Sequence, residues 1–208
     1  MGSGIFYPGV DGDDGWKEGG SFRAAYDWIG IGNSGSACQA FIRFPNVTIP
    51  QGSVITLAFI RFTAYLDRSN TIVKTNIYFN DSDDAVAPIS VATYNALVKT
   101  TAFVAWDGLA SWINGTTYDT LSIITPLQEI VDRGGFASGN AVMVLIEDDG
   151  SDVNAHRLAS DLSHLAGAEK PELHVEWSII EDDVAGWNPQ DKGSNISIDG
   201  TFLTATHA

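Results

Sequence analysis

The sequence predicts an all-β protein, an antiparallel jelly-roll-like β-sandwich with one short helix. Three observations support this fold class. The 208 residues include 21 glycines and 11% aromatic residues, a composition typical of short strands joined by tight turns. Hydrophobic residues make up 44% of the chain, which is enough to bury a core without disulfides. Apolar and polar residues also alternate along several segments, as they do in half-buried strands.

The alternation is clearest in residues 54–66 and 171–180. A period of two places every second side chain on the core face of a sheet. In the first segment the expected core face consists of Val54, Ala58, Ile60, Phe62, Ala64 and Leu66. In the second segment it consists of Leu173, Val175, Trp177 and Ile179.

Further strands are expected at residues 21–31, 37–44, 71–79, 102–106 and 141–146. The last of these is apolar on both faces, which is typical of a central strand. Residues 90–99 are ambiguous, and one helical turn beginning near Thr93 is one interpretation. A helix is predicted at residues 126–133, because Thr125 is a suitable N-cap, Pro126 suits the first helical position and Gly134 ends the helix.

The pattern divides the chain into three parts. Residues 1–19 are rich in Gly and Asp and are expected to form an N-terminal arm. Residues 20–180 form the predicted sandwich. An acidic break at 181–183 then leads into residues 181–208, a C-terminal appendage or the start of a second β unit, which is too short to bury a core of its own.

Charge and composition exclude several classes of partner. The formal net charge is −15, which argues against nucleic acid or anionic lipid as the main partner. The chain has no run of 18 apolar residues, so we expect no membrane insertion. The first residues lack the basic and apolar regions of a secretory signal. A single cysteine, Cys38, excludes an internal disulfide and a cysteine-rich zinc site.

Three acidic clusters are candidates for a structural calcium ion, which takes six to eight oxygen ligands. None of them matches an EF-hand loop, since the twelfth position counted from Asp11 is Phe22 rather than Glu. The alternative interpretation is that they are solvated turns of an acidic chain. The first and third clusters are the better candidates. The three clusters are Asp11, Asp13 and Asp14; Asp81, Asp83 and Asp84; and Asp148, Asp149 and Asp152.

Aromatic side chains in loop-like stretches are candidates for ligand binding, because a rigid exposed ring can stack on a sugar. Packing within the loop is the alternative for each of them. Trp106 and Trp177 occupy core-like strand positions, and the role of Trp28 stays open. The candidate ligand-binding residues are Trp16, Trp112 and Tyr118.

Two arginines, Arg43 and Arg157, occur within apolar strands. We expect each to pair with a carboxylate at the margin of a sheet, since a buried guanidinium needs partners. A role in ligand binding is the alternative.

Catalysis has little support in the sequence. It contains no Gly-x-Ser-x-Gly nucleophile motif. On a strand, His156 and Ser160 would lie about 13 Å apart, too far for activation of a nucleophile. We therefore expect a protein that is not an enzyme, and no catalytic residue is assigned.

The run AFIRFPNVTIPQGSVITLAFIRFTA resembles the first half of DNRLRE-type β-sandwich domains. Later segments match the same family in the same order. They are Gly135–Ala141 (GFASGNA), His156–Ser160 (HRLAS) and the Pro171-x-Leu173 strand. The resemblance covers about residues 20–180. The tail Trp187-Asn188-Pro189-x-Asp191-Lys192 is similar to the first strand of lectin-like domains in phage proteins.

This resemblance implies a jelly-roll-like sandwich of the kind seen in non-catalytic carbohydrate-binding modules. Such domains occur in extracellular, cell-wall and phage structural proteins. The expected function is a non-catalytic surface or virion structural module, such as a decoration, adaptor or fibre-associated protein, located in a virion or outside the cell. Its terminal arms would contact other virion or surface proteins or further copies of the chain. The alternatives are a dedicated glycan-binding module and a polysaccharide-degrading enzyme.

Overall fold

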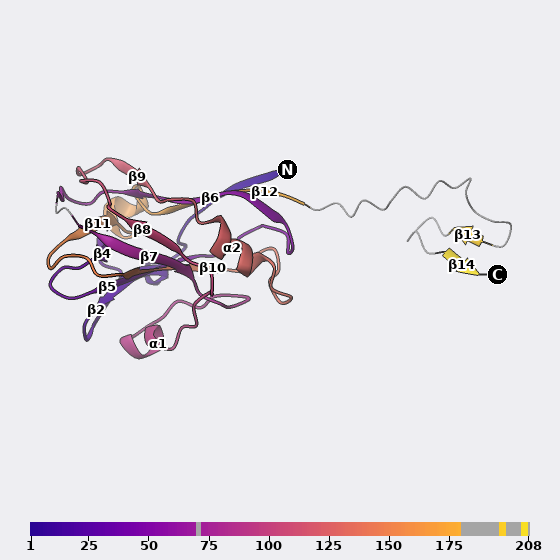
Figure 1. The fold of residues 1–208 in the computed structure, drawn as a ribbon, viewed down its shortest axis with the longest axis horizontal. Coiled ribbons are helices and arrows are strands. Elements are labelled where there is room, and N and C mark those ends of the chain that lie inside the picture. The colour runs from indigo at the N-terminus through magenta and orange to yellow at the C-terminus, as the bar shows by residue number, and fades with distance from the viewer. Residues whose placement is uncertain (70–71, 180–195, 199–204, 208) are drawn as a thin grey trace.

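The computed structural model shows an antiparallel β-sandwich and describes residues 1–69, 72–179, 196–198 and 205–207. One layer is a four-stranded sheet with the order β1 (Gly2–Phe6), β12 (Glu172–Ser178), β6 (Val54–Thr63) and β9 (Thr117–Asp119). The other is a six-stranded sheet with the order β3 (Ser21–Ala24), β2 (Asp14–Glu18), β5 (Cys38–Phe44), β10 (Val142–Asp148), β7 (Lys74–Phe79) and β8 (Val104–Asp107). Figure 1 shows how the strands of the two layers are arranged.

Smaller elements complete the fold. Strands β4 (Trp28–Gly32) and β11 (His156–Ser160) pair with each other, and Ala159 of β11 forms a bridge to Ala64, just after β6. The helices are α1 (Val91–Asn95) and α2 (Ile124–Val131), with 3-10 turns at Asp11–Asp13 and His164–Gly167. Strands β13 (Ile196–Ile198) and β14 (Ala205–His207) pair with each other. The remaining residues expected in the C-terminal appendage lie outside the described residues. Among the described residues, no helix is long and apolar enough to cross a membrane.

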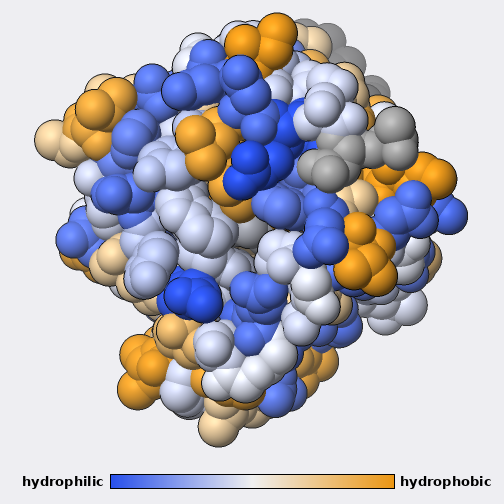
Figure 2. Space-filling view, turned by 90° about the vertical axis from the view of Figure 1, so that its left-hand side faces the viewer, coloured by the Kyte–Doolittle hydropathy of each residue, from blue (hydrophilic) through white to orange (hydrophobic). Residues whose placement is uncertain are grey.

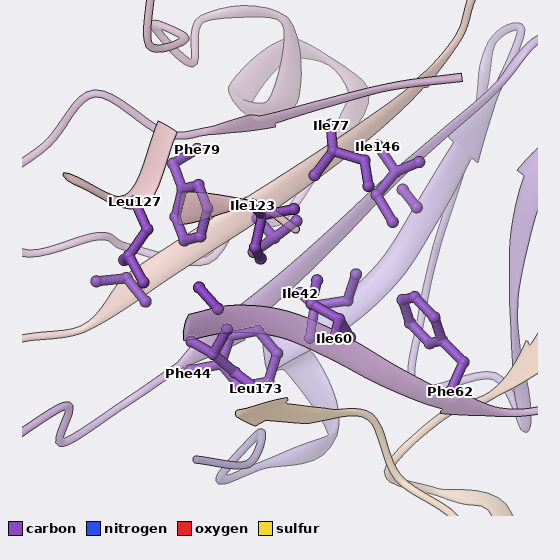
Figure 3. Close-up of a cluster of buried hydrophobic side chains, with 14 of the residues drawn as sticks. Ile42, Phe44, Ile60, Phe62, Ile77, Phe79, Ile123, Leu127, Ile146 and Leu173 are labelled. Atoms are coloured by element: carbon purple, nitrogen blue, oxygen red, sulfur yellow. The ribbon is translucent and has the colours of Figure 1, made fainter. Parts of the chain in front are cut away.

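The core lies between the two sheets. Figure 3 shows Ile42 and Phe44 of β5 facing the same interior as Ile60 and Phe62 of β6, with Leu127 of α2 closing one end. All five side chains are fully buried. Burial of such apolar surface is the main favourable term in folding, so these strands hold the sandwich together.

The alternation predicted for residues 54–66 is confirmed in the middle of the strand and fails at its ends. Ala58, Ile60 and Phe62 are buried, whereas Val54 is 41% exposed. The pairing of β6 with β12 shifts between Glu176 and Trp177, and this bulge turns Ile55 into the core in place of Val54.

The N-terminal residues differ from the sequence prediction. Residues 1–19 were expected to form an arm, but β1 pairs with β12 and β2 pairs with β5 inside the two sheets. Their pattern gives little sign of this, because β1 reads Gly-Ser-Gly and β2 begins with Asp14-Gly15. Backbone pairing to apolar neighbours compensates for the weak local preference.

The helix near residue 126 begins earlier than predicted. It spans Ile124–Val131, and its N-cap is Ile123, whose side chain makes no capping hydrogen bond. Thr125, expected as the cap, therefore lies in the first turn. The ambiguous segment 90–99 contains α1, where the Ser90 side chain accepts a hydrogen bond from the Thr93 N–H.

The two arginines in apolar strands serve the fold. Arg43 pairs with Asp13, with 2.9 Å between Nη1 and Oδ1, as expected. Buried Arg157 donates hydrogen bonds to the carbonyl oxygens of Leu109 (2.7 Å) and Ala110 (2.8 Å). The guanidinium of Arg157 thus fixes the loop after β8, whose carbonyl groups would otherwise lack these donors.

Replacing Arg157 by Met should lower the free energy of unfolding by about 2–4 kcal/mol, because carbonyl groups in the 109–110 loop lose their donors. Denaturant unfolding measures the change. The matched control is Arg61→Met, which removes the exposed pair with Asp119 and should cost less than about 1 kcal/mol. Equal losses in the two variants would contradict this role for Arg157.

Candidate ligand-binding groove

The outer face of the six-stranded sheet carries a row of polar side chains. The register pairs Lys17 of β2 with Gln39 of β5, Gln39 with Glu147 of β10, and Glu147 with Asn76 of β7. Residues paired in this way project to the same face of a sheet. The row therefore crosses four neighbouring strands, a span of about 15 Å at about 4.8 Å per strand.

A groove of about 250 Å³ lies along this row. One side is the sheet itself, and the other is the segment that contains α1, which passes below the sheet in the view of Figure 1. We call it the outer groove. It is lined by Lys17, Gln39, Tyr94, Asn95, Leu97, Lys99, Leu145 and Glu147.

The α1 segment is fixed to the sheet by a small second core. The buried ring of Tyr94 packs with Phe41, Met143 and Leu145, and its hydroxyl donates to the carbonyl oxygen of Ala40 at 3.4 Å. Burial raises the pKa of Tyr94 well above its usual range, so this hydroxyl stays protonated. One wall of the outer groove is therefore held in place by apolar packing.

Most polar groups of the row have no partner within the protein. Among the described residues, the side chains of Gln39 and Asn95 make no hydrogen bond, and Lys17 makes only a cation–π contact with Tyr94. Oδ1 of Asn76 is buried and likewise without a donor. An amide such as Gln39 offers two donors and one acceptor, so the row has unused hydrogen-bonding capacity.

Aromatic rings border the same face. Tyr78 pairs with Leu145 in the register, and its ring lies 5.2 Å from the half-exposed ring of Phe103. Nζ of Lys99 lies 4.9 Å from the centre of the Tyr78 ring and 2.6 Å from Oε2 of Glu147. Polar groups and ring surface thus occur side by side, as they do in many small-molecule sites.

The rings expected to bind a ligand are mostly packed into the fold. Trp16 and Trp112 are 0% and 2% exposed, so the exposure expected of both is wrong. Trp16 lies on the inner side of β2 against Trp28, with ring centres 4.1 Å apart. Tyr118 is half-buried and stacks on Trp112 at 5.1 Å, and these two rings line a separate pocket of about 250 Å³ together with Trp106. The Gly and Asp residues next to Trp16 and Trp112 in the sequence suggested exposed loops, but the folded chain buries both rings.

The first acidic cluster is divided between different partners. Both oxygens of Asp13 are engaged, Oδ1 by Arg43 and Oδ2 by the backbone N–H groups of Gly9 and Val10. Asp11 is exposed. Asp14 instead accepts a hydrogen bond from the Leu162 N–H at 3.0 Å, and its Oδ1 is buried without a partner. These three carboxylates do not converge on one point.

The other two clusters also make bonds within the protein. Arg133 pairs with Asp83 at 2.6 Å and with Asp81, and Asp84 accepts the Ala141 N–H. In the third cluster, Asp148 accepts the Ser151 N–H at 3.1 Å. Asp149 and Asp152 are exposed. Among the described residues, no three His, Cys, Asp or Glu side chains are arranged to hold a metal ion.

His156 and Ser160, which were considered for activation of a nucleophile, have other partners, as does Asp161 beside them in the chain. The Ser160 hydroxyl donates to Glu169 at 2.9 Å, and Nε2 of His156 lies 3.0 Å from Nε of Arg68. Burial and the Arg68 charge lower the pKa of His156. Asp161 accepts three backbone N–H groups, those of Tyr26, Ser163 and His164. Each group thus has a structural contact that explains its position.

The outer groove could not be located from the sequence alone. Lys17, Gln39, Asn76 and Glu147 come from four strands, and β2 was not expected to be a strand. The available sign was the polar residues Gln39 and Glu147 within the mostly apolar strands β5 and β10. Only the register shows that these residues stand in one row.

Replacing Asp14 by Asn should make stability less dependent on pH. Burial, with the nearby charge of Asp161, raises the pKa of Asp14 to about 8, against about 3.9 in an unfolded chain. Between these values the carboxyl group of Asp14 binds a proton in the folded state and not in the unfolded state, so its contribution to stability is greatest below about pH 4 and is lost as pH rises to about 8. The slope is about 1.4 kcal/mol per pH unit. Urea unfolding from pH 4 to 8.5 should show a smaller slope in the variant. An unchanged slope would contradict a protonated Asp14.

Structural calcium at the first or third cluster stays a prediction. The contacts of Asp13 and Asp148 within the protein make these clusters a poor fit as they stand. If one binds calcium, the ion should raise the melting temperature relative to a chelator, and Asp13→Asn or Asp148→Asn should remove the difference. Identical melting curves with calcium and with chelator would rule out a stabilising ion.

Comparison with known proteins gives no family assignment. No protein-family model matches this chain, and no curated protein matches it as a relative. The resemblance to DNRLRE-type domains therefore stays a prediction, and the function must be argued from the outer groove.

Proposed function

We propose that this chain is a non-catalytic module that binds a glycan in the outer groove and serves in a virion or at a cell surface. The observation that carries the proposal is the row of polar side chains across four strands, in which the side chains of Lys17 and Gln39 and Oδ1 of Asn76 have no hydrogen-bond partner among the described residues. A ligand rich in hydroxyl groups satisfies such groups, because each hydroxyl both donates and accepts.

The composition of the face suits sugar better than an apolar ligand. Gln39 and Asn95 supply amide donors and acceptors, and Glu147 supplies a carboxylate. Tyr78 and Phe103 supply ring surface against which the C–H side of a sugar packs. Figure 2 shows the end of the sandwich that lies at the left of Figure 1, where hydrophobic residues form separate patches among hydrophilic ones.

A structural role in an assembly is compatible with glycan binding. Strand β1 is the outermost strand of its sheet and pairs only with β12 among the described residues. Its free edge has unpaired backbone groups that can accept a strand from a neighbouring protein or from another copy of the chain. This observation supports the virion or surface module with assembly partners and favours it as the second candidate function.

Retention on insoluble polysaccharides tests the glycan proposal, with soluble sugar products measured in the same tubes. We expect retention without product. Gln39→Ala and Tyr78→Ala should each weaken retention at least tenfold, since each removes a direct contact. Loss of retention is expected without a change in melting temperature for Gln39→Ala, whose side chain makes no bond in the protein.

The control variant is Thr56→Ala, on the outer face of the opposite sheet. It should bind as the wild type does. Equal weakening by Thr56→Ala and Gln39→Ala would place binding elsewhere. Release of sugar products would overturn the non-catalytic assignment, and absence of retention on every polymer would leave the assembly role as the better candidate.

A further inference from the structure

The four-stranded sheet has one edge strand without charge. The edges of this sheet are β1 and β9, and the edges of the six-stranded sheet are β3 and β8. Three of these four strands contain a charged residue, Arg23 in β3, Asp107 in β8 and Asp119 in β9. Strand β1 reads Gly-Ser-Gly-Ile-Phe and, with five residues, is also the longest of the four. Charged residues and short length protect edge strands against pairing with other chains, and β1 has neither.

Aromatic packing holds β1 on its sheet. A Cβ atom at Gly2 would lie 2.5 Å from the Trp177 ring, and one at Gly4 would lie 2.7 Å from the Phe6 ring. The two glycines therefore leave room for buried rings that cover the inner side of the strand. In an antiparallel pair, the N–H and C=O groups of alternate residues bond to the neighbouring strand, here β12. Those of the other residues point away from the sheet, and among the described residues no second strand pairs with them.

The sequence of β1 is complementary to itself in side-chain size. In an antiparallel pair of two β1 strands centred on Gly4, Ile5 of each copy stands opposite Ser3 of the other. In the same register, Phe6 of each copy stands opposite Gly2 of the other. Each large side chain thus meets a small one on both faces of the joined sheet. The pairing also covers part of Ile5, which is 47% exposed in a single copy.

The net charge of −15 on each copy does not oppose this contact. On the outer face, Ser3 has Glu176 as its neighbour on β12. Ile5 has His174 as its neighbour there. Across the two β1 strands, Glu176 of one copy and His174 of the other are three strand spacings apart, about 14 Å. At physiological salt the Debye length is about 8 Å, so exposed charges at this distance are largely screened.

We propose that β1 pairs with β1 of a second copy of this chain, so that two four-stranded sheets form one continuous antiparallel sheet across a two-fold axis at Gly4. This inference rests on the assembly role proposed above and names its partner, and it does not require glycan binding. The contact is isologous and closes at two copies. Because only five residues of each copy pair, the dimer is weak and is strengthened where many copies are held together.

Sedimentation equilibrium of the full chain tests the dimer, over concentrations from about 10 μM to about 1 mM, the range of a weak contact. We expect the average mass to rise from one chain to two and no further. Ser3→Glu should weaken dimerisation at least about fivefold, because it places two like charges about 7–8 Å apart across the axis. Ser3 is exposed, so the melting temperature and the retention on polysaccharides should stay as in the wild type.

The matched control is Thr117→Glu, which adds the same charge at an exposed position of β9, the opposite edge of the same sheet. It should dimerise as the wild type does. Equal weakening in the two variants would assign the effect to net charge and overturn the role of β1. A mass of one chain at every concentration would also overturn the inference, and retention on polysaccharides would still decide the glycan proposal separately.

Disulfide trapping tests the register. Directly opposite residues of an antiparallel pair have Cβ atoms about 4.5–5.5 Å apart, whereas diagonal neighbours are about 7–8 Å apart. An oxidised equimolar mixture of Ser3→Cys and Ile5→Cys should therefore form a covalent dimer with one chain of each kind. Ser3→Cys alone should form at least about fivefold less, since its two thiols are diagonal neighbours. The native Cys38 is buried and does not compete. Equal trapping in the mixture and in Ser3→Cys alone would overturn the pairing centred on Gly4.

Discussion

The antiparallel register of the six-stranded sheet is the constraint on which the rest of the molecule depends. Because side chains alternate between the two faces, one pairing decides both what enters the core and what faces outward. Ile42 and Ile146 are buried between the sheets only if Gln39 and Glu147 stand together on the outside. A slip by one residue would place amides and carboxylates in the core. The free energy that fixes the core therefore also fixes the row of polar side chains.

The fold class was predictable from the sequence, because the alternation of apolar and polar residues that indicates a strand lies within the strand itself. Alternation in β12, with Leu173, Val175 and Trp177 inside, is visible without knowledge of any neighbour. Strand β2 was missed for the opposite reason. Its Asp14 and Gly15 have low strand preference, and the strand exists because β3 and β5 pair with it on both sides.

The candidate site was predicted less well, because exposure is a property of the folded chain. Trp16 lies among Gly, Asp and Lys in the sequence, yet it is fully buried because its strand turns that face inward. The sequence predicted that Arg43 pairs with a carboxylate, since an arginine within an apolar strand needs a partner, but it did not identify that carboxylate as Asp13. Asp13 could not be chosen among 26 acidic residues without the topology that brings β2 beside β5.

The two walls of the outer groove are held in place by different contacts, so substitutions in the two walls differ in their effect on stability. The strands that form the sheet wall bury the main core with their opposite face, so they tolerate little alteration. The α1 segment belongs to the connection between β7 and β8, which rests on the sheet through Tyr94 and Ala85 in the second core and through the hydrogen bond from Arg43 to the Ala85 carbonyl. Substitutions at the exposed positions of α1 itself leave the hydrogen bonds between the strands of the two sheets untouched. Ligand preference can therefore diverge among variants of this chain through the connection alone, while thermodynamic stability stays with the sheets.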